Sequence, residues 1–516
     1  MAKCSSAIPN GLITLDGESQ TPLYRQFYET LRRAILTGQL APGTRLQSTR
    51  EMAEELSVSR NTVVSAYEQL LAEGYLKGQA GSGTYVSRAL PEDLLNVKTV
   101  TRRIPRAGAK VVGLSERGRS LAAFAPMIPR APEPVRPFQT GVPALDAFPF
   151  DIWSRLLVRR WRRPAATLLG YGEPQGHAPL RRAVSSYLGL ARAVRCAPEQ
   201  VIIVDGAQMA FDLIARVLLD PGDAAWIEEP GYPAARAAFT AAGARLAHVP
   251  VDAEGLDVAA GASLEPGARL VYVTPSHQFP LGMTMSLPRR LALLDWASRA
   301  GAWIVEDDYD SEYRYEGRPL ASLQGLDADG RVIYLGTFSK VMFPSLRLGY
   351  MVVPAELVDA FIAARAIAGR HSPTVEQAAL TDFIEEGHFG RHIRRMRTLY
   401  RERQAALIEA LRVEAGDLVE AEPSDAGLQL TAWLPEGLDD TEVARTAAAR
   451  GVESRAMSSF YAQRRGRPAL LLGYAAFDTG RLRHGAAQLY AAARACIGGA
   501  AGKRGGAPAE AAARVR

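Results

Sequence analysis

Cysteine is scarce in this chain: Cys4, Cys196 and Cys496 are the only three among 516 residues. So few and so widely separated thiols argue against a disulfide framework or a zinc cluster, and we expect no metal site. No apolar run is long enough to cross a bilayer, and the first residues lack the basic-then-apolar pattern of a secretory signal. These absences predict a cytoplasmic protein without a membrane segment.

The composition is that of a folded protein with more than one domain. Hydrophobic residues make up 47% of the chain, and 516 residues are too many for one ordinary core. The net charge is +6, and residues 89–136 alone hold nine Lys and Arg against four Asp and Glu, a surplus of five. A solvated basic linker explains this surplus as well as a nucleic-acid contact does. Charge alone therefore assigns no partner.

The segment 21–88 carries the punctuation of a small helical domain. Thr21-Pro22 is typical of a helix start, because proline is preferred at the first helical position. Ser48 and Glu51 have the spacing of a capping box, which begins a second helix. Ser59 can cap a third helix that ends at Gly74. After this helix, Tyr75–Lys77 and Thr84–Val86 flank the glycine-rich turn Gly81-Ser82-Gly83, as the strands of a hairpin do. Three helices and a hairpin predict a winged helix-turn-helix domain.

Changes in composition mark the other domain borders. Residues 1–20 form an N-terminal tail, and residues 89–136 gather Arg, Pro and Gly, which predicts a linker with little fixed structure. Residues 137–497 form the large domain. Residues 498–516 are rich in Ala, Gly and Arg and predict a disordered tail.

Short apolar runs alternate with helical patterns in the large domain, which predicts an α/β fold with a mainly parallel sheet. The strands that we expect are Val201–Val204, Ala224–Ile227, Leu270–Val273, Trp303–Val305 and Val332–Leu335. Polar or glycine-rich residues follow each of them directly. Because sheets of this kind bind ligands beyond the carboxyl ends of their strands, these residues predict one shared cleft.

The start of the third helix carries side chains of the kinds that contact double-stranded DNA. In a helix-turn-helix domain the first residues of this helix face bases in the major groove. They are Ser59, Arg60, Asn61 and Thr62, of which Arg can bond guanine, Asn adenine, and the Thr methyl can meet thymine. Arg50 is placed for a phosphate contact, and Gly83 leaves room for the wing to approach DNA. The alternative is a helical hairpin used only for oligomerisation.

Lys340 follows an expected strand end, where its amine can form a Schiff base with the aldehyde of pyridoxal 5′-phosphate (PLP). A lone lysine is more often a solvated surface group, so the neighbouring chemistry decides. Asp307 is placed to keep the PLP pyridine nitrogen protonated, and Tyr309 to bond the ring 3′-oxygen. The alternative is that the acidic run around Asp307 only caps the next helix.

The phosphate of PLP needs hydrogen-bond donors, and the sequence offers two kinds. The backbone of Ala207 and Gln208 begins a helix, which is a natural anion site. Arg347 adds a guanidinium seven residues after Lys340. Tyr232 offers an aromatic face on which the PLP ring can stack.

Specific motifs resemble two known families. Residues 21–87 resemble the winged-helix domain of GntR-type regulators in the segments Pro22-Leu23-Tyr24, Ser59-Arg60-Asn61-Thr62-Val63, Glu73-Gly74-Tyr75-Leu76 and Gly81-Ser82-Gly83-Thr84. Residues from about 136 to 495 resemble a fold-type I aminotransferase in the segments Tyr171-Gly172-Glu173-Pro174-Gln175-Gly176, Glu306-Asp307-Asp308-Tyr309-Asp310, Ser339-Lys340 and Arg347-Leu348-Gly349. The fusion of the two resembles the MocR subfamily of GntR regulators.

This resemblance implies that Lys340 forms the Schiff base with PLP. It implies that Asp307 contacts the PLP ring nitrogen, Tyr309 the 3′-oxygen and Arg347 the phosphate. It also implies that Ser339 binds the cofactor. It also implies a homodimer, in which Tyr171 reaches the phosphate held by the partner subunit, and an operator with two half-sites. One departure is Phe279, which stands where these enzymes have asparagine and removes one contact to the 3′-oxygen.

Further departures concern the ligand. Leu470–Gly473 lacks the arginine with which related enzymes hold a substrate α-carboxylate. Ala234 and Ser459 stand near positions that are arginine in GABA-sensing members of the subfamily. We therefore expect neither GABA nor an α-amino acid held in the usual way. Arg236 and Arg455 are the remaining candidates for an anion site.

The leading hypothesis is a PLP-dependent transcription regulator whose large domain senses a small amine, an amino-acid-related ligand or PLP itself, without sustained turnover. The alternative is a working aminotransferase that carries a DNA-binding module. A third hypothesis is a DNA-binding protein with a cofactor-free domain. It is the weakest, because the sequence keeps the residues expected to hold PLP.

Overall fold

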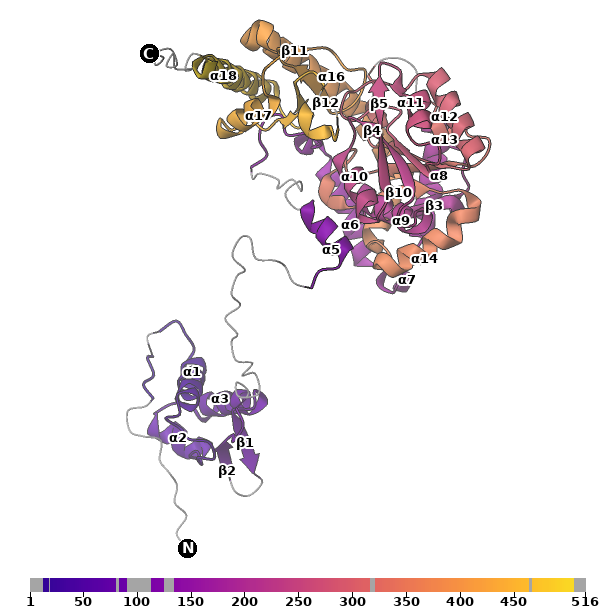
Figure 1. Cartoon of the computed structure of the whole chain (residues 1–516). Helices are drawn as coiled ribbons and strands as arrows, with labels where there is room; N and C mark the ends of the chain where they lie inside the picture. Colours follow the sequence, from indigo (N-terminus) through magenta and orange to yellow (C-terminus); the bar gives the residue numbers. More distant parts are fainter. Residues whose placement is uncertain are drawn as a thin grey trace, which may run out of the picture. The chain divides into compact units, whose positions relative to one another are not determined.

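A computed structural model describes residues 13–17, 19–79, 83–90, 113–124, 134–315, 321–463 and 466–504. The chain divides into two compact units, residues 1–112 and residues 113–516. The smaller unit is a winged helix-turn-helix and the larger one an α/β domain, as predicted (Figure 1).

The smaller unit, which we call the DNA-binding module, has three helices and a two-stranded hairpin: α1 (Leu23–Leu36), α2 (Thr49–Glu55), α3 (Arg60–Ala72), β1 (Leu76–Gln79) and β2 (Gly83–Val86). The predicted capping box is present, since Ser48 accepts a hydrogen bond from the Glu51 amide and the Glu51 carboxylate bonds back. Phe27, Val63 and Leu70 are completely buried and join the helices in one core. β1 and β2 pair antiparallel as the wing, whose tip at residues 80–82 lies outside the described residues.

The larger unit is built on an eight-stranded sheet in the order β3-β10-β9-β8-β7-β4-β5-β6. Its strands are β3 (Val201–Val204), β4 (Ala224–Glu229), β5 (Arg245–Asp252), β6 (Gly255–Leu256), β7 (Leu270–Val273), β8 (Trp303–Asp308), β9 (Val332–Thr337) and β10 (Gly349–Val352). Neighbours from β9 to β5 run parallel, whereas β10 pairs antiparallel with both β3 and β9. The five predicted strands are all present, and β5, β6 and β10 are additional.

Helices cover both faces of this sheet (Figure 1). Adjacent residues of β3 show the alternation, because Ile202 packs into one apolar cluster and Ile203 into another. The first cluster includes α9 (Ala207–Leu218), α10 (Pro233–Ala241) and α14 (Val358–Gly369). The opposite face carries α6 (Phe150–Arg162), α8 (Ala178–Arg192), α11 (Val258–Leu264), α12 (Leu287–Ala300), α13 (Leu323–Leu326), α15 (Thr374–Glu385) and α16 (His388–Ala415). The short α7 (Ala166–Leu169) precedes α8.

A second, four-stranded antiparallel sheet follows α16, in the order β11-β12-β14-β13. Its elements are β11 (Glu420–Ala421), β12 (Gln429–Trp433), β13 (Arg455–Ala456), β14 (Ala469–Gly473) and the packed helices α17 (Asp440–Ala449) and α18 (Thr479–Arg504). α18 runs beyond residue 497, where we expected the domain to end. Residues 498–504, which we predicted to belong to a disordered tail, are therefore helical, although three of these seven residues are glycine.

The prediction of a linker with little fixed structure was wrong for part of residues 89–136. Residues 116–123 form the helix α5 (Glu116–Ala123), whose first turn is capped by Ser115, and α5 packs against α10. Residues 91–112 and 125–133 lie outside the described part of the chain. Ser115 stabilises the first turn of α5. This cap was overlooked because the composition around it, rich in Arg and Gly, is typical of a linker.

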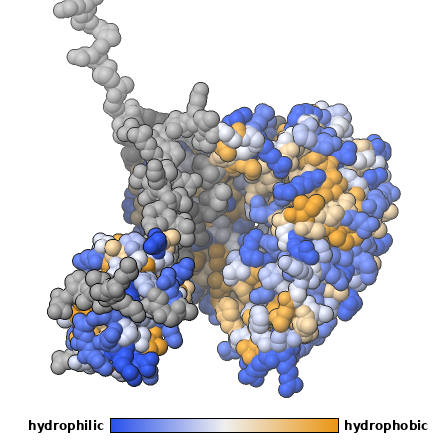
Figure 2. Space-filling view, turned by 90° about the horizontal axis from the view of Figure 1, so that it is seen from below, coloured by the Kyte–Doolittle hydropathy of each residue, from blue (hydrophilic) through white to orange (hydrophobic). Residues whose placement is uncertain are grey.

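None of the described helices is long and apolar enough to cross a membrane. Figure 2 shows hydrophobic side chains gathered in a patch on one face of the larger unit, among a mainly hydrophilic surface. Large exposed hydrophobic residues include Leu169, Tyr171 and Ile367 of this unit, at 59%, 83% and 83% exposure.

Candidate functional site

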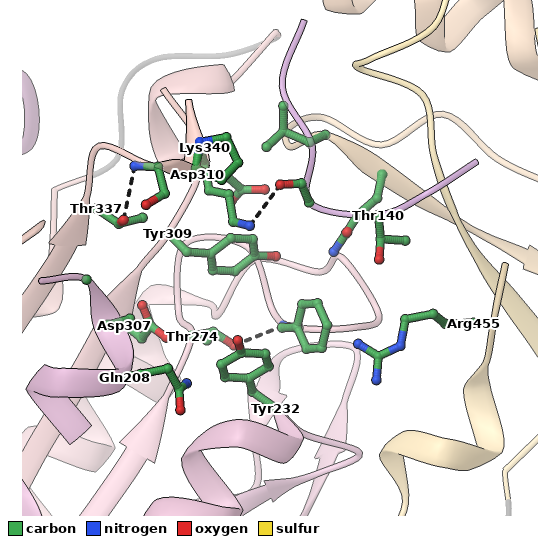
Figure 3. A pocket seen from close by; sticks show the side chains of 18 of the residues that line it. Thr140, Gln208, Tyr232, Thr274, Asp307, Tyr309, Asp310, Thr337, Lys340 and Arg455 are labelled. Carbon is green, nitrogen blue, oxygen red and sulfur yellow. Dashed lines mark hydrogen bonds between the residues drawn. The ribbon is translucent and has the colours of Figure 1, made fainter. Parts of the chain in front are cut away.

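One cavity lies at the carboxyl ends of β4, β7, β8 and β9, where the sequence predicts a cleft. Its volume is about 260 Å³. Residues from distant parts of the chain line it, including Thr140, Gly141, Gly206, Ala207, Gln208, Tyr232, Tyr272, Thr274, Phe279, Asp307, Tyr309, Asp310, Thr337, Ser339, Lys340, Arg347 and Arg455 (Figure 3). Apart from Tyr171, every predicted cofactor contact therefore borders this cavity.

Lys340 reaches into the cavity from the segment after β9 (Figure 3). Its Nζ donates a hydrogen bond to the carbonyl oxygen of Gly141 at 2.9 Å. Burial lowers the pKa of the Lys340 amine, although the nearby carboxylates of Asp310 and Asp307 oppose this. A Cβ atom at Gly141, where φ is +74°, would lie 2.8 Å from Nζ, so a larger residue there would make the end of the Lys340 side chain shift. A lysine that loses its proton readily is the nucleophile that an aldehyde needs.

Asp307, at the end of β8, turns its carboxylate toward the cavity and accepts a hydrogen bond from the Tyr272 hydroxyl at 2.7 Å. Burial raises the pKa of Asp307 to about 7. The neighbouring Asp308 lies on the other side of the strand, where its carboxylate pairs with Arg192 at 2.8 Å. Of these two acids, only Asp307 can contact a ligand in the cavity.

The hydroxyl of Tyr309 is hydrogen-bonded to a buried histidine, His277. It lies 3.0 Å from Nδ1 of the buried His277, and the same nitrogen lies 3.0 Å from Oδ2 of Asp310. Burial raises the pKa of Tyr309 well above its ordinary value, so the phenol keeps its proton. Neither His277 nor Asp310 was among the predicted contacts, although Asp310 ends one of the aminotransferase-like segments and His277 closely follows a predicted strand.

The start of α9 presents backbone amides at another wall of the cavity. Gly206 precedes the helix with φ of +100° and has no side chain with which to cap the backbone amides of the first turn. The guanidinium of Arg347 lies beside it, since a Cβ atom at Gly206 would be 3.5 Å from Nη1. None of the described residues forms an ion pair with Arg347. Helix amides and an unpaired guanidinium together suit a phosphate dianion.

Aromatic side chains and one arginine close the cavity. The ring of Phe279 packs edge-on against Tyr232, with 5.2 Å between centroids. Arg455, from β13, points into the cavity beside these rings (Figure 3). Arg236 does not line the cavity, because its guanidinium turns to the carbonyl oxygen of Phe460. Of the two arginines that the sequence left as candidates for an anion site, only Arg455 therefore borders the cavity.

Tyr171 lies outside the cavity of its own subunit. Its side chain is 83% exposed, and the guanidinium of Arg370 stacks on its ring at 4.2 Å. A cofactor contact by Tyr171 would have to be made in another subunit.

In the DNA-binding module, the predicted DNA contacts lie at the surface and not in a cavity. Arg50, Arg60 and Asn61 are exposed at the starts of α2 and α3. Ser59 and Thr62 are engaged with each other, because the Ser59 hydroxyl accepts from the Thr62 amide at 3.1 Å and lies 2.8 Å from its hydroxyl. These two side chains shape the helix start, and the exposed side chains of Arg50, Arg60 and Asn61 are available to a ligand.

Gly83 begins the second strand of the wing with φ of +116°. A Cβ atom there would lie 3.1 Å from Nε of Arg45, so a larger residue would displace this guanidinium. The backbone of Arg45 also forms a bridge to Tyr85 of the wing. Arg45 is a basic residue at the wing that no local sequence signal singled out.

The larger unit offers the groups that PLP requires. A buried amine, a carboxylate for the ring nitrogen, an aromatic wall and an anion site surround one cavity, and Gly206 and Gly141 provide space that side chains would fill. The described residues therefore fit this cofactor.

Comparison with known proteins agrees with both units. Residues 157–488 match the family model of aminotransferase class I and II, and residues 23–86 match that of bacterial regulatory proteins of the gntR family. The solved structure of the α-aminoadipate aminotransferase LysN from Thermus thermophilus, complexed with N-(5′-phosphopyridoxyl)-L-leucine, is 32% identical, with a TM-score of 0.65. The match covers 70% of this chain and 92% of that one.

Regulators match over nearly the whole chain. The probable rhizopine catabolism regulatory protein MocR of Rhizobium meliloti is 45% identical over 474 residues, which are 92% of this chain and 94% of the relative. The pyridoxine biosynthesis transcriptional regulator PdxR of Corynebacterium glutamicum is 32% identical over 91% of this chain and 96% of its own. The chain thus belongs to the MocR subfamily of gntR-type transcription regulators, in which a helix-turn-helix module is joined to a PLP-binding domain of the class I and II aminotransferase fold.

Proposed function

We propose that the protein controls transcription by sensing a small amine-bearing or amino-acid-related ligand, or PLP itself, in the cavity of the larger unit. One observation carries the proposal: the Lys340 amine, the Asp307 carboxylate and the Arg347 guanidinium border one cavity of a chain that also holds a winged helix. PLP, when bound, supplies an aldehyde that condenses reversibly with amines and a ring that withdraws electrons. Binding that favours one arrangement of the chain would then change its affinity for DNA.

Each cavity residue has a defined task in this proposal. Lys340 is the amine that holds PLP covalently, and its lowered pKa keeps it reactive. Asp307 pairs with the ring nitrogen, while Tyr309, held by His277, donates to the 3′-oxygen. The amides of Ala207 and Gln208 bind the phosphate together with Ser339 and Arg347, and Tyr232 packs against the ring.

In the DNA-binding module, Arg60 and Asn61 read base edges, and Arg50 holds a phosphate. Ser59 and Thr62 set the start of the recognition helix, and Gly83 lets the wing approach the backbone. We further propose a cytoplasmic homodimer that binds two half-sites, in which Tyr171 completes the partner's phosphate site. The exposed hydrophobic residues Leu169 and Ile367, close to Tyr171 and its stacking partner Arg370 in the chain, support an interface there.

A second candidate function is aminotransferase catalysis. The strand Leu470–Gly473 lacks an arginine, as the sequence indicates, but Arg455 of the neighbouring β13 borders the cavity. A carboxylate-bearing substrate therefore has a cationic partner, which the sequence offered only as one of two candidates. The regulator relatives and the attached module favour sensing.

One experiment separates the two functions. The purified PLP-loaded protein is mixed with a panel of amines, amino acids and keto acids, while the cofactor absorbance, the product and the affinity for operator DNA are measured together. We expect a ligand that shifts the absorbance and changes DNA affinity without sustained product formation. Turnover of roughly 1 per second or faster with a common amino acid and keto acid would establish the enzyme instead.

A further inference from the structure

Among the described residues, Arg455 is the one cationic side chain that borders both the cofactor cavity and a second cavity. No acceptor or carboxylate in the described part of the chain bonds to its guanidinium, which instead lies 4.7 Å from the ring centroid of Phe460. Burial lowers the pKa of Arg455, which shows that its charge is partly withdrawn from water. A guanidinium in this state is left without the partner that usually offsets its desolvation.

The second cavity lies between α5, α9 and α10 and is the larger of the two, at about 830 Å³. It adjoins the cofactor cavity, because Gln208, Tyr232 and Arg455 border both. Most of the surface that it exposes is apolar: Ala234 and Ala238 of α10 face Leu121 and Phe124 at the α5 side.

The three arginines that border the second cavity differ in their surroundings. Arg216 already has a carboxylate partner, since it pairs with Asp212 on α9 at 2.8 Å. Arg117, on α5, is exposed at the outer edge. Arg455, at the junction, is therefore the cation that a ligand spanning the two cavities would meet. An anionic group there would supply the missing partner, and small alanine side chains leave room for an apolar body beyond it.

We propose that Arg455 binds the anionic group of the regulator's ligand and that the apolar part of this ligand occupies the second cavity, against α5. The inference rests on the proposed sensing function and narrows its ligand to an amine-bearing acid with an apolar portion. It also identifies α5 as the element that meets the ligand. In sequence, α5 lies between the DNA-binding module and the rest of the larger unit. A ligand held against α5 therefore contacts the segment of the chain through which the two units are joined.

The test uses the full-length PLP-loaded protein and probes that carry no amine. 3-Phenylpropionate has an anionic group and an apolar body, and 3-phenylpropan-1-ol has the same body without the charge. Binding of each is measured by isothermal titration calorimetry to the wild type and to Arg455→Met, with Arg450→Met as a matched control at an exposed arginine of the same unit. Ala238→Leu, which narrows only the second cavity, tests the apolar part.

We expect 3-phenylpropionate to bind the wild type and to bind Arg455→Met at least tenfold more weakly, roughly the loss of one charge-assisted hydrogen bond. Arg450→Met should bind like the wild type, Ala238→Leu several-fold more weakly, and the alcohol should be insensitive to Arg455→Met. Equal binding of the acid to Arg455→Met and wild type, or no binding to the wild type, would overturn the inference.

These outcomes are independent of the sensing function, because neither probe can react with the PLP aldehyde. Sensing fails if no amine changes DNA affinity, whatever the acids do. The assignment of Arg455 fails if acid binding ignores this residue, even in a protein that responds to amines.

Discussion

The two units of this protein build their sites in opposite ways. In the DNA-binding module, Arg50, Arg60 and Asn61 come from one short stretch and stand exposed at helix starts. In the larger unit, the cavity joins Gly141, Lys340 and other residues that lie far apart in the chain, and both of its carboxylates, Asp307 and Asp310, are buried. A contiguous surface can be altered one contact at a time. A convergent cavity depends on the whole fold that brings its parts together.

The largest expected effect is in the cavity. Lys340→Ala should abolish covalent attachment of PLP, because no other described lysine borders the cavity. Absorbance of the purified protein and mass spectrometry after borohydride reduction measure this. Lys77→Ala, in the wing, is the matched control and should retain the cofactor. Reducible attachment that survives Lys340→Ala would assign PLP to another lysine.

In the module we expect separable single contacts. Arg60→Ala should cost about 1–3 kcal/mol of DNA binding and relax preference at one base position. Arg50→Ala should weaken binding to all sequences and reduce its dependence on salt. Titration of wild-type and altered operators at several salt concentrations distinguishes the two. Exchange of these two patterns would show that the helices dock differently.

A buried histidine gives the larger unit a pH dependence that exposed residues lack. His392 is 4% exposed, and burial lowers its pKa to about 4 while Nε2 donates to the Val341 carbonyl oxygen. Its stabilising contribution is complete above the unfolded pKa of 6.5 and is lost as the pH falls toward 4. Between neutral pH and about pH 5 we expect a loss of about 2 kcal/mol from this residue.

Urea unfolding followed by tryptophan fluorescence measures this loss, since all six tryptophans lie in the larger unit. His392→Gln should remove about 2 kcal/mol of the pH dependence, whereas His484→Gln, at an exposed histidine, should leave it unchanged. An identical pH dependence in His392→Gln and wild type would contradict the assignment.

The smallest expected effect tests whether the cavity extends across subunits. Tyr171→Phe should lower PLP affinity by roughly tenfold or less, the value of one hydrogen bond to phosphate, and leave the dimer intact. Mixed dimers of Lys340→Ala and Tyr171→Phe subunits should hold one site with wild-type affinity. A monomer by light scattering with PLP fully bound would rule out the shared site.

Local signals in the sequence predicted local structure well. The capping box at Ser48 is present, and the strands Val201–Val204 and Leu270–Val273 begin and end where the hydrophobic runs do. The helix α5 was missed because its single cap is hidden in a stretch rich in Arg, Gly and Pro. β10 was missed because its short apolar run follows Lys340 without a turn signal of the kind used for the other strands.

The sequence by itself determined the two fold classes, the chemistry of the lysine, carboxylate and arginine set, and the exposed helix starts of the module. These follow from short-range patterns, since caps, periodicity and strand ends depend on neighbours in the chain. Only the tertiary structure decided that Lys340 bonds to the carbonyl oxygen of Gly141, that Arg455 and not Arg236 enters the cavity, and that α5 borders a second one. Such pairings join residues hundreds of positions apart, and no local propensity records which distant side chains the packed core brings together.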